Sequence, residues 1–207
     1  MAHLRTAPDG IAAAHHRHTA PQRPLRVVGK DATLADLRGA AGIQVTGSHD
    51  MVADVDYVAP LARVLEATAA DGVPVLGVCF GHQFLGVHFG ATLASWDRAS
   101  VGVADITYQA TGPLADETVP VVLTHRDRLT DLGDVLRPCG TGGFGGVQAW
   151  RHPDLPMWGV QGHPEADAAL TRRMEGDGVA AYTDAELETP GAKGILWRFG
   201  ALMNQFG

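Results

Sequence analysis

Short apolar runs alternate along the first half of the chain with segments in which apolar residues recur every three or four positions. The runs predict buried strands and the periodic segments predict helices. The predicted strands are residues 2–6, 25–28, 42–48 and 73–78, and the predicted helices are residues 11–18, 32–38 and 58–70. Strands that alternate with helices of this length predict a parallel sheet covered by helices on both faces.

The pattern changes after residue 89, where apolar runs follow one another without helical segments between them. Residues 91–96, 101–108, 119–123, 135–138 and 147–150 predict antiparallel strands added at one edge of the sheet. The glycine-rich residues 140–146 lack the Lys-Ser/Thr pair of a phosphate-binding P-loop, so we expect a hairpin loop there. A last strand at 157–161 and helices at 166–174 and 194–206 complete the pattern.

Together these elements predict an α/β fold, a three-layer sandwich whose central, mostly parallel sheet carries antiparallel edge strands. The length predicts one domain, residues 1–207. The net charge of −7, with Lys and Arg scattered, argues against a nucleic-acid surface. Neither a membrane span of ~18 apolar residues nor a signal peptide is visible in the sequence. Two cysteines form no disulfide framework, so we expect a cytoplasmic protein.

The run at 73–78 ends in a Gly-X-Cys-X-Gly pentad, and an amphipathic segment follows at 83–89. A strand, a tight turn and a helix in this order lift one side chain onto a sharp elbow at the carboxyl edge of a sheet. Here that side chain is the thiol of Cys79. Gly77 and Gly81 suit the turn because strand and helix backbones approach closely there. Taken alone, Cys79 is better explained as a small buried hydrophobic residue, and Cys139 is predicted to be one.

A nucleophilic thiol needs a base, a group that orients the base, and donors for the oxyanion. His163 and Glu165 lie two residues apart after the predicted strand 157–161. In extended backbone they would point the same way, so the carboxylate can reach one imidazole nitrogen while the other faces the thiol. Singly, His163 also fits an ordinary loop histidine and Glu165 a charge at a helix N-terminus. Because parallel strand ends converge on one edge, we expect both residues near Cys79.

Two backbone segments are candidates for the oxyanion donors. The Phe80 amide lies at the start of the predicted elbow helix, where N–H groups have no intrahelical partner. A second donor could come from the glycine turn at residues 46–48, which follows another predicted strand.

These residues carry a family resemblance. Residues 77–83 (Gly-Val-Cys-Phe-Gly-His-Gln) and 161–165 (Gln-Gly-His-Pro-Glu) resemble the two signatures of the class I (triad) glutamine amidotransferases. The turn at 46–48 resembles that family's oxyanion strand, and residues 124–127 (Thr-His-Arg-Asp) are similar to a loop of its stand-alone, GMP synthetase-like branch. The resemblance spans about residues 40–170, with order and spacing as in the family, and implies its flavodoxin-like fold.

The resemblance implies a catalytic triad of Cys79, His163 and Glu165, and an oxyanion hole made by the amides of Gly47 and Phe80. It also implies a substrate site.

In that implied site Gln83 contacts the γ-glutamyl substrate, and backbone near His125 and Arg126 holds the α-amino and α-carboxylate ends. The implied reaction cleaves the γ-amide of glutamine through a γ-glutamyl thioester on Cys79, and gives glutamate and ammonia for a separate acceptor enzyme. The same residues leave two alternatives open. One is a hydrolase of γ-glutamyl peptides or amides that acts without a partner, and the other is a non-catalytic binding module with an inert thiol.

The expected partners are glutamine or another γ-glutamyl small molecule and, for the first activity, an ammonia-accepting synthetase subunit. We expect neither nucleic acid nor a membrane as a partner, and no cofactor. The cluster His15, His16 and His18 could bind a metal, but no Cys or carboxylate spacing supports a site, so we expect no metal. Two features depart from the family pattern, namely the short, polar N-terminus and Gly162, which stands where many members have Phe.

Overall fold

The computed structural model describes residues 2–4, 26–28, 31–175 and 181–203. The helix predicted at 11–18, with its histidine cluster, and the last residues of the helix predicted at 194–206 lie outside the described residues.

Five neighbouring strands form the parallel half of one sheet. In spatial order they are β2 (Arg26–Val28), β1 (Ala2–Leu4), β3 (Ile43–Val45), β4 (Val75–Val78) and β9 (Met157–Val160). Each neighbouring pair is parallel, as the alternation of strands and helices predicts. The polar N-terminal segment does supply a strand, since β1 pairs with both β2 and β3. Strand pairing uses backbone groups, so it does not require an apolar run.

The sheet continues beyond β9 through four antiparallel strands. They are β8 (Ala149–Arg151), β7 (Arg137–Gly142), β5 (Thr92–Tyr108) and β6 (Glu117–Asp131), which complete a nine-stranded sheet in the order β2-β1-β3-β4-β9-β8-β7-β5-β6. The prediction of antiparallel strands on one side of the sheet is confirmed.

The lengths of these antiparallel strands differ from the prediction. The strands predicted at 91–96 and 101–108 are one strand, β5, and β6 runs well past residue 123. The expected loop at 124–127 is therefore part of β6. The two strands pair along most of their length, with an irregular register between Ser95 and Ser100. Backbone hydrogen bonds between them therefore maintain the strand conformation in polar stretches as well. The glycine hairpin is also shorter than expected, because residues 140–142 pair with β5.

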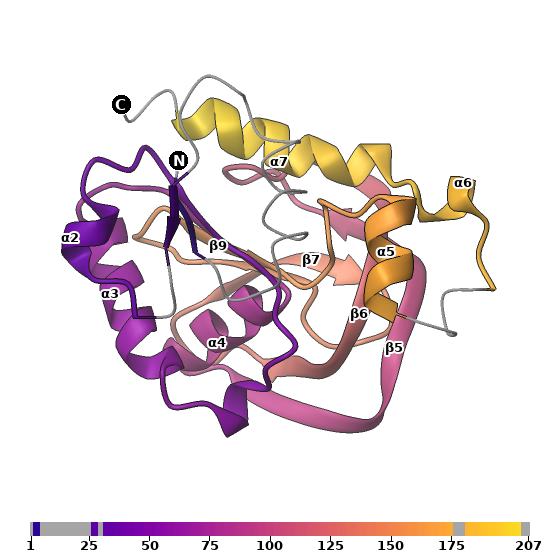
Figure 1. The fold of residues 1–207 in the computed structure, drawn as a ribbon, viewed down its shortest axis with the longest axis horizontal. Coiled ribbons are helices and arrows are strands. Elements are labelled where there is room, and N and C mark those ends of the chain that lie inside the picture. Colours follow the sequence, from indigo (N-terminus) through magenta and orange to yellow (C-terminus); the bar gives the residue numbers. More distant parts are fainter. Residues whose placement is uncertain (1, 5–25, 29–30, 176–180, 204–207) are drawn as a thin grey trace.

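The helices lie on both faces of the sheet (Figure 1). They are α2 (Leu34–Leu37), α3 (Val58–Ala70), α4 (Phe80–His88), α5 (Ala168–Glu175), α6 (Asp184–Leu187) and α7 (Pro190–Met203), with a 3-10 turn η1 (Val52–Asp54). The predicted helix 58–70 coincides with α3. α7 begins before the predicted residue 194, at a proline, which suits the first helical position because it has no N–H to leave unpaired.

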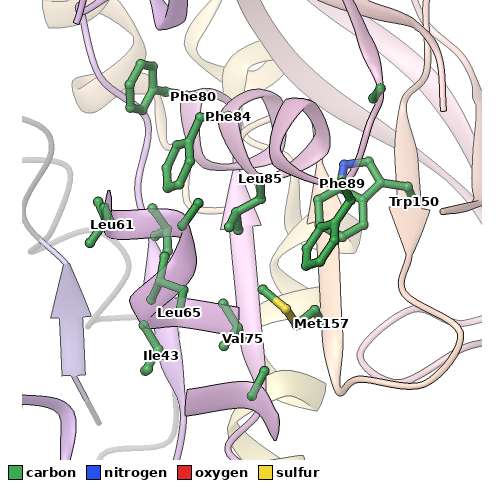
Figure 2. Close-up of a cluster of buried hydrophobic side chains, with 14 of the residues drawn as sticks. Ile43, Leu61, Leu65, Val75, Phe80, Phe84, Leu85, Phe89, Trp150 and Met157 are labelled. Atoms are coloured by element: carbon green, nitrogen blue, oxygen red, sulfur yellow. The ribbon is translucent and has the colours of Figure 1, made fainter. Parts of the chain in front are cut away.

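Two apolar clusters fill the space between these layers. One lies under α3 and α4, where Leu61, Leu65 and Phe84 pack on Ile43 and Val75 (Figure 2). The other lies under α7 and has the members Leu76, Val78, Val160, Ile195 and Phe199. Successive residues of β4 thus face opposite clusters, as alternation in a strand requires. This arrangement confirms the predicted three-layer α/β sandwich.

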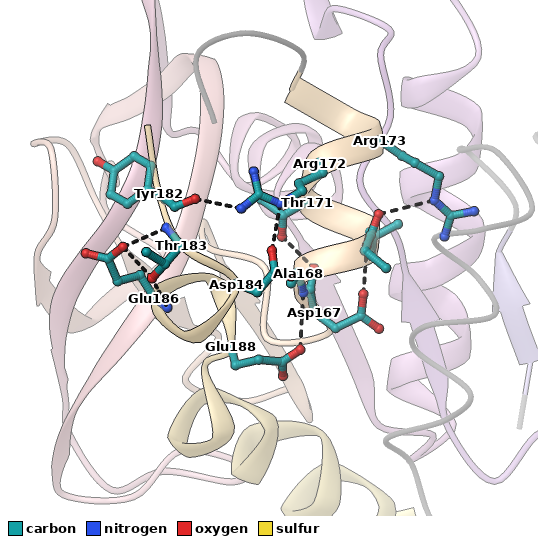
Figure 3. A network of polar contacts seen from close by, with 12 residues as sticks. Asp167, Ala168, Thr171, Arg172, Arg173, Tyr182, Thr183, Asp184, Glu186 and Glu188 are labelled. Atoms are coloured by element: carbon teal, nitrogen blue, oxygen red, sulfur yellow. Dashed lines mark hydrogen bonds and ion pairs between the residues drawn. The ribbon is translucent and has the colours of Figure 1, made fainter. Parts of the chain in front are cut away.

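The segment that follows β9 is held by a polar network (Figure 3). The Arg172 side chain donates to Asp184 Oδ1 at 2.8 Å and to the Tyr182 carbonyl at 2.6 Å. The Ala168 amide donates to Glu188 Oε1 at 3.2 Å. These hydrogen bonds join α5 to α6 and so fix the position of the chain that follows β9. Among the described residues, none of the helices has the length and apolar character needed to cross a bilayer.

Candidate active site

Three adjacent parallel strands end at the same edge of the sheet. β3, β4 and β9 are neighbours in that order, and each is followed by a predicted site residue, Gly47, Cys79 and His163 respectively. A Cβ built on Gly47 would lie 3.0 Å from His163 Cε1 and 3.6 Å from Cys79 Cβ. The structure therefore brings these three residues into contact distance across the strand ends.

Cys79 has an unusual backbone conformation. Its φ of 50° is positive, and among the described residues every other positive φ belongs to a glycine. A side chain at positive φ costs free energy, so the surroundings must hold it in place. The Cys79 amide donates to the Val160 carbonyl at 2.9 Å, which extends the β4–β9 pairing by one residue. The thiol is thereby fixed on the predicted elbow between β4 and α4.

The glycines on either side of the elbow are needed for close approach. A Cβ on Gly77 would lie 2.7 Å from the Gly81 carbonyl group, and a Cβ on Gly81 would lie 2.7 Å from the Val45 carbonyl oxygen. Both contacts are with backbone, which cannot move aside. The prediction that strand and helix backbones meet at these two glycines is confirmed.

His163 and Glu165 form a buried pair. His163 Nδ1 lies 2.7 Å from Glu165 Oε1, and the two residues are 1% and 0% exposed. The expected route to this contact, an extended backbone, is wrong. His163 forms only an isolated bridge with Val122, and the chain then turns, with the Ala166 amide donating to the His163 carbonyl at 3.1 Å. The turn brings the carboxylate back to the imidazole and leaves Nε2 on the side of the thiol.

Burial and charge act in opposite directions on the His163 imidazole. Burial by itself lowers its pKa, but the Glu165 carboxylate and the Cys79 sulfur raise it, and the net pKa is well above the usual 6.5. No hydrogen bond of ordinary geometry reaches His163 Nε2 from the described residues. The Cys79 sulfur nevertheless lies close enough to raise the pKa of the ring by its charge, and contacts between catalytic groups often tighten only when substrate binds.

The Cys79 sulfur has two polar neighbours besides the imidazole. Its Sγ lies 3.8 Å from the Thr124 carbonyl oxygen in β6 and 3.7 Å from Gln161 Nε2 at the end of β9. Cys79 is 7% exposed, so the thiol is nearly enclosed. A thiol between a carbonyl acceptor and an amide donor, beside an imidazole–carboxylate pair, can be deprotonated and then used as a nucleophile.

The predicted substrate residues lie at the same edge. Gln83, on α4, is 5% exposed and donates from Nε2 to the Asp127 carbonyl at 2.7 Å. His125 and Arg126 follow Thr124 directly in β6, and the strand turns the first inward and the second outward.

Two further histidines are buried at or near the site. Desolvation lowers the pKa of His125 to about 4, with the Asp127 carbonyl hydrogen bond opposing it. Because a carbonyl can only accept, the 3.0 Å contact from Nδ1 to Asp127 O identifies the Nδ1–H tautomer of His125. Burial likewise lowers the pKa of His82 to about 3, and its ring stacks on Trp150 at 6.0 Å. Both rings are therefore neutral at pH 7.

Gly162, which departs from the family pattern, allows close packing against β6. A Cβ at this position would lie 2.2 Å from Val121 Cγ1 in β6. A larger residue would require the Val121 side chain or β6 itself to move. Among the described residues, no three His, Cys, Asp or Glu side chains group in a way that could hold a metal ion.

Comparison with known proteins identifies the family. The model of the class-I glutamine amidotransferases matches residues 14–174, more than half of the chain. The chain belongs to this family. The chain is 27% identical over 115 residues to a GMP synthase (glutamine-hydrolyzing) subunit of Thermococcus kodakarensis, a match that covers 54% of this chain and 61% of that protein. It is 36% identical over 108 residues to anthranilate synthase component 2 of Mycobacterium tuberculosis, covering 50% of this chain and 47% of that one.

The fold of the chain is shared with solved structures. A glutamine amidotransferase from Thermotoga maritima superposes with a TM-score of 0.75 at 16% identity, over 98% of this chain and 96% of that one. This likeness supports the predicted flavodoxin-like fold. The matches to the two curated synthase components span less than two thirds of either protein's length.

Two polar groups at the sulfur were not predicted from the sequence. Gln161 stands in the second signature, but the sequence patterns indicate no role for it. Its spacing of two from His163 was an available signal, because alternate residues near a strand end face the same side. The Thr124 carbonyl carried no such signal, since a backbone acceptor is the same at every residue and only β6 pairing places it at the thiol.

Proposed function

We propose that this protein hydrolyses the γ-amide of glutamine through a Cys79 thioester and supplies the ammonia to a separate synthetase. The observation that carries the proposal is the buried His163–Glu165 pair beside a thiol held on a strained elbow. Burial of a charged imidazole–carboxylate pair costs free energy, because both groups lose their hydration. A neighbouring thiolate stabilises the positive charge on the imidazolium, and perturbed pairs of this kind are typical of functional sites.

In the proposed reaction His163 takes the thiol proton, and the Cys79 sulfur attacks the γ-carbonyl carbon. The oxyanion that forms accepts hydrogen bonds from the Gly47 and Phe80 amides, each worth ~3 kcal/mol by analogy with other acyl-transfer sites. His163 then protonates the leaving nitrogen, the C–N bond breaks, and ammonia departs. Water attacks the thioester while His163 takes its proton, and glutamate leaves with the thiol restored. Glu165 orients the ring and stabilises the imidazolium in each half-reaction.

Gln83, His125 and Arg126 are proposed to hold the substrate. Gln83 already uses Nε2 in a bond to protein, which leaves its carbonyl oxygen to accept from the γ-glutamyl substrate. The backbone of His125 and Arg126 would bind the α-amino and α-carboxylate groups. The support for this placement is that they follow Thr124, whose carbonyl oxygen lies 3.8 Å from the Cys79 sulfur.

A partner that consumes ammonia is proposed from the relatives. One relative is named as a GMP synthase subunit and another as a component of anthranilate synthase. A chain of this kind would be one part of a synthetase assembly, and the acceptor would be bound by the other part.

The test is glutamate release from glutamine by the purified chain, measured with Cys79→Ala and the matched control Cys139→Ala. We expect Cys79→Ala to lose at least about 10⁴-fold in kcat/KM, because the covalent route is removed. Cys139→Ala should retain the activity. Mass spectrometry should detect a γ-glutamyl adduct on Cys79 during turnover. Release of glutamate by Cys79→Ala at the wild-type rate would overturn the proposal, and γ-glutamyl peptides cleaved in preference to glutamine would replace it with a partner-independent hydrolase.

A further inference from the structure

A fully buried glutamine outside the proposed triad contacts the sulfur of the proposed nucleophile. Gln161 is 0% exposed, and its Nε2 lies 3.7 Å from Cys79 Sγ. Its backbone is anchored, since its amide donates to the Gln148 carbonyl at 2.9 Å. The orientation of a buried side-chain amide is determined by its other hydrogen bonds, and the structure shows those of Gln161.

The orientation of the Gln161 side-chain amide follows from its neighbours. Gln83 Nε2 lies 2.7 Å from the Asp127 backbone carbonyl, which can only accept, so the atom of Gln83 at this point is its NH₂ group. The same NH₂ group lies 3.2 Å from the side chain of Gln161, so the Gln161 atom facing it is the oxygen. The Gln161 NH₂ group is then the one that faces Cys79. The hydrogen-bonding partners of the two glutamines therefore identify the Gln161 group at the sulfur as a donor.

The two neighbours of the sulfur favour different protonation states. A neutral thiol can donate its S–H to the Thr124 carbonyl oxygen, 3.8 Å away. A thiolate has no proton to donate and is repelled by a carbonyl oxygen, but it accepts well from an N–H group. The Gln161 donor therefore stabilises the ionised form of Cys79.

We infer that Gln161 stabilises the Cys79 thiolate by donating an N–H to Sγ, and that Gln83 holds the Gln161 amide in the orientation this requires. The inference rests on the proposed function in taking Cys79 as the nucleophile. It gives Gln83 a second task, because the side chain expected to touch substrate also determines which end of the Gln161 amide meets the sulfur.

The experiment measures alkylation of Cys79 by iodoacetamide in the full chain from pH 5 to pH 10, with the labelled peptide quantified by mass spectrometry. Gln161→Met keeps the length and removes the donor. We expect its Cys79 to react about tenfold more slowly than wild type at pH 7, with the midpoint of the profile moved to higher pH and the rates converging at pH 10. Loss of packing alone would not produce a difference that vanishes at high pH.

Gln44→Met is the matched control, because Gln44 is also 0% exposed, lies in β3, and makes no side-chain hydrogen bond to the sulfur. It should leave the profile unchanged. Gln83→Met releases the Gln161 amide without removing it and should slow labelling by a smaller factor of about three. If Gln161→Met does not fold, Gln83→Met decides, since slower labelling supports the inference and a wild-type profile overturns it. A wild-type profile for Gln161→Met, or an equal loss in Gln44→Met, also overturns it.

Alkylation needs no substrate, so failure of the inference and failure of the proposed function are distinguishable. A wild-type chain that releases no glutamate, but whose Cys79 labelling depends on Gln161, would contradict the proposed function and support the inference. A chain that hydrolyses glutamine while Gln161→Met labels like wild type would do the reverse.

Discussion

Cys79 and Cys139 belong to the same apolar cluster beneath α7, and they are 7% and 2% exposed. The two thiols otherwise differ in the polar groups that surround them. Cys139 lies within β7, in the antiparallel half of the sheet, where burial raises the pKa of its thiol to about 12 despite the opposing charge of Arg151. Cys79 lies past the end of β4, where it meets His163 and Gln161. Burial alone therefore gives an inert thiol, and the position at converging strand ends supplies the groups that can make a thiol reactive.

Alkylation should show the largest difference between the two cysteines. With a pKa of about 12, Cys139 has roughly one thiolate in 10⁵ molecules at pH 7. We expect iodoacetamide to label Cys79 more than about 10³-fold faster than Cys139 in the native chain, quantified by peptide mass spectrometry. In guanidinium chloride both should label at similar rates. Equal labelling in the native chain would remove the contrast between the two regions.

A methyl group at Gly47 should disturb the Cys79 region without reaching Cys139. The added carbon would lie 3.0 Å from His163 Cε1, so the ring or the strand end must shift. We expect Gly47→Ala to lower kcat/KM for glutamine about 10²-fold, because small displacements of catalytic groups are costly. In Gly194→Ala the atoms nearest to the methyl would be those of the Arg198 guanidinium, 3.1 Å or more away, so the contact lies far from the Cys79 region in the chain. That control should keep full activity. Wild-type activity in Gly47→Ala would contradict the predicted steric contact with His163.

The Glu165 carboxylate should determine the alkaline side of the pH profile. Glu165 is the strongest of the influences that raise the pKa of His163, while burial lowers it. In Glu165→Gln the pKa of His163 falls, so the imidazolium is lost at lower pH and kcat/KM should decline earlier on the alkaline side. We expect about a tenfold loss near pH 8 and a smaller one near pH 6. Glu186→Gln, at an exposed helix cap, is the control, and a uniform loss at all pH values would argue for a purely structural role.

Replacement of Cys139 should give the smallest effect and only on stability. Cys139→Ala removes a buried sulfur from the cluster beneath α7, and we expect the free energy of unfolding to fall by about 1 kcal/mol. Chemical denaturation with urea measures this loss. Glutamate release at 25 °C should stay at the wild-type rate, because Cys139 is predicted to have a packing role only. A large loss of activity in Cys139→Ala would contradict the expectation that Cys139 has a packing role only.

The sequence by itself determined the elements and the chemistry that they display. Period and composition predicted α3 to the residue and the alternation that makes half of the sheet parallel. The spacing around Cys79 and around His163 predicted an elbow thiol and a histidine with its carboxylate, because those features depend on residues close together in the chain. The extent of β5 and β6 could not be predicted, because their polar middle sections are held by pairing with each other.

Only the tertiary structure decided which groups surround the sulfur. The Thr124 carbonyl reaches it because β6 runs on as a strand through residues 124–127, and Gln161 reaches it in an orientation determined by Gln83. Even the His163–Glu165 contact forms through a turn, not through the extended backbone that its spacing suggested. The physical reason is that hydrogen bonds between distant segments depend on where backbones end and turn in space, which a local pattern of residues does not specify.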